Sequence, residues 1–418
     1  MVKRQNDPRR RRQRWAKQAA ALFLLLPLLA LGWLYSSLPD RVYLEAGQAL
    51  VLPRFSYLEP LGMHGSRNAA STQAVGSYQA TLSLGGWLPV KTIRTIVTER
   101  RQVTVCGTPF GVKLFSEGAL VVGFSDVESS SGGTVNPAKA AGLHLGDRVI
   151  RIGQTETEGN DAVKAALEAA EGRAVDVLYI RNGEQKCTTL TPVWDETARQ
   201  WRAGMWVRDS SAGVGTLTFA DAERGIFAGL GHPISDSDTG ESIALRTGEI
   251  VPCEITGCSK GTAGSPGELK GRFLSTRAIG TIGVNGENGV YGTTRIHFAG
   301  QTMEVAFAQE VTTGSAEIWS TISGETPRAY QVQIERIRDA DARRNMVLRV
   351  TDPELLAQTG GIVQGMSGSP IVQNGRLVGA VTHVLVNDPT RGYGIFAQTM
   401  LEQAEIVAQR TQNPELAK

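Results

Sequence analysis

Short apolar segments separated by glycines are the feature of this 418-residue chain that most limits its fold. Glycine occurs 48 times, well above the share of about 7% in an average protein. From residue 196 to 405, glycines separate runs of four to eight residues rich in Val, Ile and Thr, as in strands joined by turns. This pattern predicts a mainly β fold, a barrel or a sandwich, with one late helix near 398–408. The clearest predicted strands are 214–219, 225–230, 277–284, 293–299, 330–337 and 345–350.

Charge is distributed unevenly. Hydrophobic residues make up 41% of the chain and charged residues 20%, which excludes a disordered or collagen-like protein. The net charge is +2, yet residues 1–17 carry eight Lys or Arg against Asp7, so the rest of the chain is net acidic. A mildly acidic body does not indicate a nucleic-acid surface, and we expect no nucleic-acid partner.

The first forty residues follow the order of an export signal. A basic arm, 1–17, precedes an uncharged stretch, and we interpret 18–38 as a signal peptide or a signal-anchor helix. The basic arm is expected to stay in the cytoplasm, with the remainder exported and associated with the membrane through this segment. No clean small-residue cleavage site follows, which favours an anchor over a cleaved signal.

Residues 39–99 are predicted to form strands and linkers, with an exposed polar stretch at 65–76. The four cysteines have no metal-site spacing, and we expect no metal or cofactor; Cys106 and Cys187 fall in one predicted domain and could pair.

Residues 100–195 form a recognisable unit. It contains Pro137-Ala-Lys-Ala-Ala-Gly-Leu-His-Leu-Gly-Asp-Arg-Val149, with Asn136 placed to cap a short helix and a second helix at 161–171. This series resembles a bacterial-type PDZ domain, which is an α+β fold. The resemblance implies a groove between the strand after Gly111 and the second helix, where a peptide adds as a strand. The groove residues would be Phe110, Gly111, Val112 and Leu167.

A candidate nucleophile lies near the end of the chain, in Gly365-Met-Ser367-Gly-Ser-Pro370. Glycines on both sides allow a tight loop that exposes the Ser367 hydroxyl. The amides of Gly365 and Ser367 are then placed to stabilise the oxyanion of a tetrahedral intermediate. The loop resembles that of chymotrypsin-fold serine proteases, which predicts a serine protease domain at 196–410.

Five histidines are available as the base. His232 is favoured because it lies in a glycine-flanked turn just after a predicted strand. His64 falls in the linker and His144 in the PDZ-like unit, whereas His297 and His383 are flanked by strand residues and are interpreted as structural, with His383 a minor rival.

Spacing alone leaves three candidates for the orienting carboxylate. Asp236 and Asp238 follow His232 closely, and Asp352 lies 15 residues before Ser367, so all three obey the order His, Asp, Ser.

The chain as a whole resembles one family. The export segment, the PDZ-like unit, Gly-Leu-Gly-His-Pro-Ile-Ser-Asp at 229–236 and Gly-Gly-Ile-Val-Gln-Gly-Met-Ser-Gly-Ser-Pro-Ile at 360–371 are similar to the stage IV sporulation protein B peptidases. The resemblance implies Ser367 as nucleophile, His232 as base and Asp352 as third triad member. It also implies an exported serine endopeptidase of the space between forespore and mother cell. Such a peptidase cleaves itself and a membrane-associated regulator of an intramembrane protease, which activates a late sigma factor.

Two alternatives compete with this interpretation. One is a non-catalytic PDZ adaptor whose protease-like domain only binds peptides. The other is a general envelope quality-control protease, although those proteins normally place the PDZ domain after the protease domain.

Overall fold

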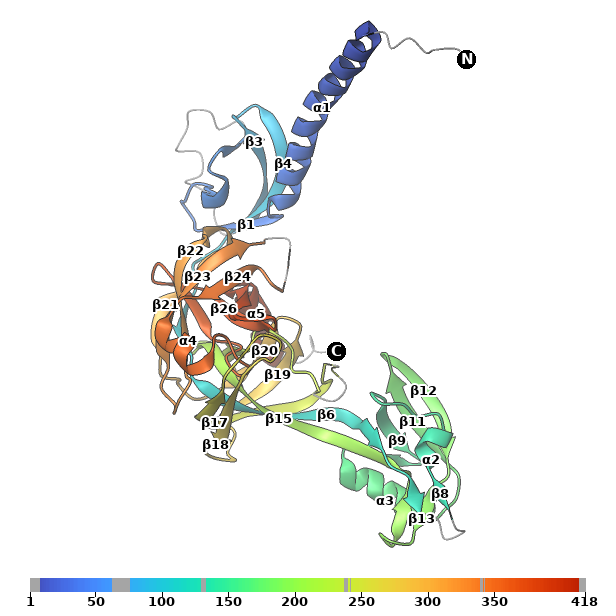
Figure 1. Ribbon diagram of the computed structural model, residues 1–418. Helices are drawn as coiled ribbons and strands as arrows, with labels where there is room; N and C mark the ends of the chain where they lie inside the picture. The colour runs from blue at the N-terminus through green and yellow to red at the C-terminus, as the bar shows by residue number, and fades with distance from the viewer. Residues whose placement is uncertain are drawn as a thin grey trace, which may run out of the picture.

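The computed structural model describes residues 8–61, 76–128, 133–236, 240, 242–338, 341 and 343–412. Figure 1 shows a small N-terminal unit, a central β-rich body and a separate α/β unit reached along two long strands. The mainly β fold predicted from the glycine and Val/Ile/Thr pattern is confirmed. His64, Asp238 and most of the stretch at 65–76 lie outside the described residues.

The N-terminal unit is a helix beside a four-stranded sheet. Leu34 and Leu38, at and just beyond the end of the helix, are buried against Val42 and Leu82 of the sheet, which fixes the end of α1 on it. Among the described residues, no helix is both long and apolar enough to cross a membrane. The elements are α1 (Pro8–Ser37), β1 (Arg41–Leu44), η1 (Pro53–Phe55), β2 (Leu58–Pro60), β3 (Gly76–Leu84) and β4 (Leu88–Val97), with sheet order β1-β4-β3-β2.

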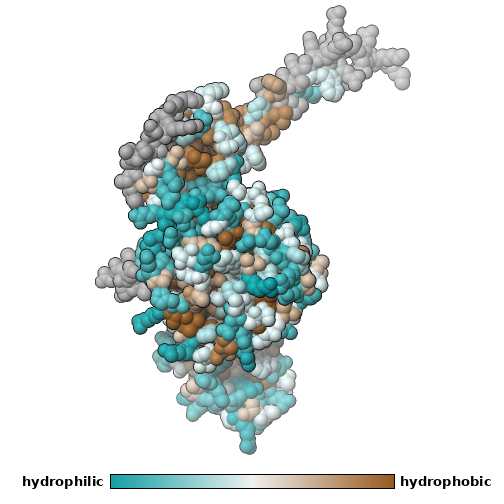
Figure 2. All heavy atoms as spheres, turned by 90° about the vertical axis from the view of Figure 1, so that its left-hand side faces the viewer, coloured by the Kyte–Doolittle hydropathy of each residue, from teal (hydrophilic) through white to brown (hydrophobic). Residues whose placement is uncertain are grey.

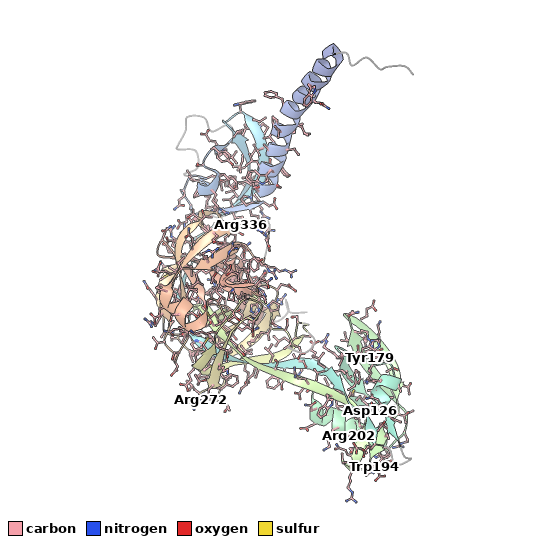
Figure 3. The ribbon with its side chains drawn as sticks, in the orientation of Figure 1. Asp126, Tyr179, Trp194, Arg202, Arg272 and Arg336 are labelled. Carbon is pink, nitrogen blue, oxygen red and sulfur yellow. The ribbon has the colours of Figure 1, made fainter. Side chains whose placement is uncertain are left out.

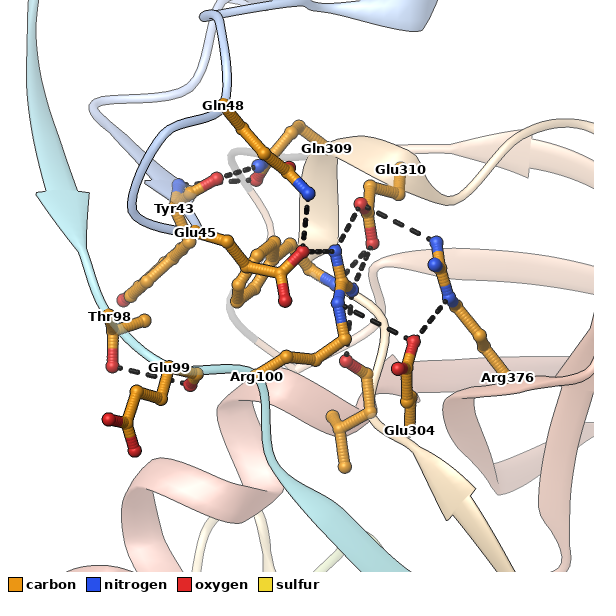
Figure 4. A network of polar contacts seen from close by, with 12 residues as sticks. Tyr43, Glu45, Gln48, Thr98, Glu99, Arg100, Glu304, Gln309, Glu310 and Arg376 are labelled. Carbon is orange, nitrogen blue, oxygen red and sulfur yellow. Dashed lines mark hydrogen bonds and ion pairs between the residues drawn. The ribbon is translucent and has the colours of Figure 1, made fainter. Parts of the chain in front are cut away.

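A buried ion-pair network joins this unit to the body (Figure 4). The Arg100 side chain is only 4% exposed and donates two hydrogen bonds of 2.8 Å to the Glu310 carboxylate. The same guanidinium donates to Glu45, which follows β1, at 3.1 Å. Because a buried cation is tolerated only when its partners are in place, Arg100 holds the two parts in one arrangement.

The first layer of the body is the part of a large sheet with the strand order β6-β17-β19-β20-β16-β15-β5-β21, and β6 also pairs with β15. The elements are β5 (Gln102–Val105), β6 (Pro109–Phe124), β15 (Met205–Asp221), β16 (Ile226–Gly229), β17 (Leu245–Ser259), β18 (Glu268–Phe273), β19 (Gly280–Gly286), β20 (Gly289–Thr294) and β21 (Gln301–Glu304). The predicted strand at 293–299 is wrong beyond Thr294, where β20 ends.

The second layer is a closed six-stranded barrel, in the order β22-β23-β24-β27-β26-β25. The predicted late helix is confirmed as α5, whose Met400, Ala404 and Val407 are buried in the core shared with the large sheet. Helix α4 was not predicted. The elements are η2 (Ala308–Glu310), β22 (Gly314–Ser320), β23 (Arg328–Ile337), β24 (Met346–Val350), α4 (Pro353–Thr359), β25 (Pro370–Gln373), β26 (Arg376–Leu385), β27 (Asp388–Phe396) and α5 (Ala397–Gln412).

The α/β unit is inserted into the large sheet and does not precede it. Strands β5 and the first half of β6 pair within the body, and the chain then enters the unit and returns along β15. The predicted boundary at residue 100 is therefore wrong, because the apolar pattern of β6 continues through both parts without a break. In Figure 3, Tyr179 and Trp194 lie in this unit, and Arg336 lies where the barrel meets the N-terminal unit.

Local signals within the unit are confirmed. The Asn136 side chain accepts a hydrogen bond from the Lys139 amide and caps α2, and Asn182 and Gly183 both have positive φ in the hairpin turn. The elements are β7 (Val127–Glu128), β8 (Thr134–Val135), α2 (Pro137–Ala140), β9 (Arg148–Ile152), β10 (Thr155–Glu156), α3 (Asn160–Ala170), β11 (Val175–Arg181), β12 (Glu184–Leu190), β13 (Val193–Asp195) and β14 (Gln200–Arg202).

The predicted peptide groove is wrong. Gly111 pairs with Val214 on one side and Val251 on the other, so this strand has no free edge for a peptide. Phe110 and Val112 are buried in the body, 1% and 3% exposed, and Leu167 is buried in the core of the α/β unit. A peptide can add as a strand only where backbone N–H and C=O groups are unpaired, and around Gly111 these groups already pair with β15 and β17.

The cysteines are all free. Cys106 is buried in the body and Cys187 is exposed in the α/β unit, so the suggested pairing does not occur.

Candidate active site

The turn after β16 presents His232. Leu230 and Gly231 both have positive φ, which turns the chain sharply at the end of β16. A Cβ atom on Gly231 would lie 2.9 Å from the Thr382 Cγ2 atom of the barrel, so glycine permits the close approach of the two layers here. His232 is partly buried in this turn.

The loop before β25 presents Ser367. The Thr216 amide of the large sheet donates to the Ser367 carbonyl at 3.0 Å, and the Thr218 hydroxyl donates to the Gly368 carbonyl at 2.7 Å. A Cβ atom on Gly368 would lie 2.0 Å from the Thr216 carbonyl oxygen, and its φ is +93°. The loop is thus fixed against the neighbouring sheet, and only glycine fits at 368.

One cavity of about 610 Å³ lies between the two layers and brings the predicted residues together. His232 lines it from the large sheet, and Gly365 and Ser367 line it from the barrel side. The remaining wall is mixed: it includes polar residues such as Ser211 and Gln364, and valines from both layers, which are Val112, Val214, Val363, Val384 and Val386. A nucleophile and a base from two layers facing one cavity is the arrangement that acyl transfer needs.

Two amides in the serine loop are available for an oxyanion. Within the described hydrogen bonds, neither the Gly365 nor the Ser367 amide donates to a protein acceptor, whereas the amides of Gln364, Met366 and Gly368 all do. Unpaired amides that flank the nucleophile can stabilise the negative charge that develops on a substrate carbonyl oxygen.

The His232 ring is oriented by a backbone carbonyl. Its Nδ1 atom lies 2.7 Å from the Pro233 oxygen, an acceptor, so Nδ1 carries the proton and Nε2 is left with its lone pair. Burial lowers the pKa of the His232 imidazole, which keeps it neutral near pH 7. Neutral Nε2 is the form required of a general base.

Comparison with known protein families indicates the class of enzyme. Residues 199–401 match the family described as SpoIVB peptidase S55. This segment of the chain thus belongs to the SpoIVB peptidase family. It is therefore a serine peptidase, a hydrolase that acts on peptide bonds. No curated protein matches the chain significantly.

The Ser367 hydroxyl of this peptidase has a backbone partner. It donates a 2.6 Å hydrogen bond to the Thr382 carbonyl in β26. This hydrogen bond must break before the hydroxyl can give its proton to His232.

His383 belongs to the site, contrary to its interpretation as a structural residue. Its ring lies 4.6 Å from the ring of His232, tilted by 35°, and it lines the same cavity. Burial, the His232 ring and the Arg344 charge hold the pKa of His383 below its usual range. The sequence kept His383 only as a minor rival to His232, because the strand pattern does not reveal the irregularity in β26 between Val381 and Val384.

The structure does not place Asp352 beside His232. Its carboxylate accepts hydrogen bonds from the Glu354 and Leu355 amides, at 2.9 and 3.0 Å, and from the Gln331 amide at 3.3 Å. It is the N-cap of α4, and it does not line the cavity. The triad role given to Asp352 gains no support from this geometry.

Asp236, the other candidate triad carboxylate among the described residues, forms an ion pair with an arginine. Asp236 is 2% exposed and forms a 2.7 Å ion pair with Arg208 of β15. The described contacts of the peptidase thus give Pro233, through its carbonyl, the orienting role that a carboxylate has in the usual triad.

Proposed function

We propose that this peptidase is an exported endopeptidase that cleaves its own N-terminal region and then a membrane-associated regulator of an intramembrane protease. That second cut would trigger activation of a late sporulation sigma factor. The proposal follows from membership of the SpoIVB peptidase family together with the cavity that contains Ser367, His232 and two unpaired amides.

The proposed mechanism uses only groups of this cavity. The Ser367 hydroxyl gives its proton to His232 Nε2 while its oxygen bonds to the substrate carbonyl carbon. The Gly365 and Ser367 amides donate to the resulting oxyanion. His232 then protonates the leaving amine, and water repeats the sequence on the acyl-enzyme. No residue of this scheme needs a metal.

Export and membrane association are part of the proposal. Residues 1–17 carry the basic charge expected on the cytoplasmic side. The exported remainder would lie in the space between forespore and mother cell, as the family resemblance implies. The described part of α1 exposes large apolar side chains, among them Phe23, Leu28 and Trp33 at 79%, 66% and 67%. Figure 2 shows apolar atoms gathered along α1 and the small sheet beside it, which supports contact of this region with an apolar environment.

The α/β unit is proposed to recognise peptides, as its resemblance to a PDZ domain implies. Any groove must differ from the predicted one, because β14 and β15 lie against α3. Trp201 of β14 donates its amide to Glu168 of α3 at 3.1 Å, and its ring reaches Gly172.

A single experiment tests the proposed function. The full chain and its Ser367→Ala variant are incubated at equal concentration, and the N-terminus of each is followed by mass spectrometry. We expect the wild type to lose a segment ending between about residues 36 and 80 and to react with a fluorophosphonate at Ser367. The variant should do neither. An intact wild-type N-terminus after long incubation would contradict self-cleavage, and absence of labelling would contradict the serine mechanism.

A further inference from the structure

A second cavity, of about 950 Å³, lies where the end of α1 meets the barrel. Its wall combines segments that are far apart in the sequence. They contribute Trp33 and Ser36 from α1, Arg54 from η1, and Arg336, Arg338 and Arg343 from the end of β23 and the turn after it. Figure 3 labels Arg336 at this junction. The cavity therefore exists only because the N-terminal unit and the barrel are held together.

The wall of this cavity carries a net positive charge. Its described lining residues include four arginines and one carboxylate, that of Asp341. Asp341 accepts hydrogen bonds from two amides of its own turn, at 3.1 and 3.0 Å, and is held there. Arg343 forms a 2.6 Å ion pair with Glu287, and Arg54 donates to the Ala308 carbonyl at 2.9 Å. Two of the four arginines thus have protein partners.

Arg336 and Arg338 are the other two. Both are exposed, and among the described residues neither guanidinium has a hydrogen bond or an ion pair. They are two positions apart at the end of a strand, so both lie on the same side of it and face the cavity together. A guanidinium matches the geometry of phosphate oxygens and can donate two hydrogen bonds to them. The ligand that this arginine pair fits is a phosphate group.

The position of the cavity along α1 indicates where such a phosphate comes from. The helix exposes apolar side chains from Phe23 to Leu29, which are 79% and 59% exposed (Figure 2). Near its end, Trp33 and Tyr35 are 67% and 55% exposed. Trp and Tyr at the end of an apolar helix are typical of the level of lipid headgroups. If α1 enters a bilayer as far as Trp33, which lines the cavity, the arginine pair lies beside the lipid phosphates.

We propose that this cavity binds the headgroup of an anionic phospholipid, with Arg336 and Arg338 as the ligands of its phosphate. The inference rests on the membrane association that is part of the proposed function. An anionic lipid is favoured over a zwitterionic one because it brings no cation of its own to the arginine pair. Since the pair belongs to the barrel, a bound headgroup would hold the catalytic layers at the membrane surface, where a membrane-associated substrate is cut.

The test inserts the full chain into lipid nanodiscs of two compositions, phosphatidylcholine alone and a mixture with phosphatidylglycerol, and compares the melting temperatures. Because a ligand of the folded state raises the melting temperature, we expect the wild type to melt several degrees higher in the anionic discs. The Arg336→Gln/Arg338→Gln variant should lose this difference. The Arg336→Lys/Arg338→Lys variant should keep part of it, since lysine retains the charge without the paired donors.

Arg151→Gln/Arg277→Gln is the matched control. Arg151 lies in the α/β unit and Arg277 between β18 and β19; both are exposed, and neither lines the cavity. This variant has the same change in net charge and should keep the full shift. Residues 1–17 are basic in every variant, so their attraction to anionic lipid cancels in the comparison. Labelling of Ser367 by a fluorophosphonate should be equal in all variants, which checks that the catalytic layers are intact.

Several outcomes would overturn the inference. One is a wild type with equal melting temperatures in the two discs; others are a full shift in the Arg336→Gln/Arg338→Gln variant and a lost shift in the control variant. Glycerol phosphate is also added to the phosphatidylcholine discs, and a shift as large as that in the anionic discs would show a site for a free phosphate compound instead of a lipid. A chain that enters neither disc would contradict the proposed membrane association itself, and the inference with it.

Discussion

Replacement of Asp352 separates two roles for its carboxylate. As the N-cap of α4 it accepts two short hydrogen bonds from the Glu354 and Leu355 amides. Asparagine and serine cap helices about as well as aspartate, whereas alanine does not. A triad carboxylate, in contrast, cannot be replaced by either, since asparagine holds the wrong histidine tautomer and costs roughly 10⁴-fold in kcat.

The expected loss of stability follows from the loss of the helix N-cap. Loss of an N-cap costs about 1 kcal/mol. A change of that size lowers the melting temperature of a domain of this size by about 2–4 °C. We therefore expect Asp352→Ala to melt a few degrees lower than the wild type but to keep its kcat at a temperature where it is folded. Asp352→Asn and Asp352→Ser should match the wild type in both measurements.

The assay is cleavage of one peptide, with thermal unfolding measured on the same preparations and Ser367→Ala as the inactive reference. An Asp352→Asn enzyme with a wild-type melting temperature and a roughly 10⁴-fold lower kcat would refute the cap as the role of this residue. It would show that α4 moves to bring the carboxylate to His232 in the active state.

Four further outcomes are expected. Ser367→Ala and His232→Ala should each lower kcat by about 10⁴- to 10⁶-fold, and the double variant should be little worse than either, because the two act as a unit; additive losses in the same cleavage assay would contradict this. Activity should persist below the ordinary histidine pKa of about 6.5, since burial lowers the pKa of His232 and protonation abolishes the base; a kcat profile with its midpoint at or above that value would contradict the burial argument. The folded-state pKa values of His232 and His383 lie below the unfolded value, so their stability contribution is present above about pH 6.5 and is lost as the pH falls, which denaturant titrations at several pH values can check. Gly368→Ala should abolish labelling of Ser367 by a fluorophosphonate, because its Cβ would overlap the Thr216 carbonyl; normal labelling would show that the loop can move away.

The local features of this protein were predictable from its sequence. Asn136 caps α2, Asn182 and Gly183 form a hairpin turn, and the glycines around Ser367 and His232 form tight turns, because each depends on residues only a few positions apart. The mainly β fold and the late helix α5 follow from periodicity in the same way. Nucleophile, base and oxyanion donors are therefore carried by two short motifs.

Only the tertiary structure decided which segments meet. The strand at Gly111 appeared to be a free edge until pairing with Val214 and Val251, each more than a hundred residues away, occupied both of its sides. Asp352 has the residue type and chain order of a triad member, but its position in space makes it a helix cap. His383 appeared to be an ordinary strand residue until an irregularity in β26 turned it onto His232. Contacts of this kind depend on packing between distant parts of the chain, which no local pattern encodes.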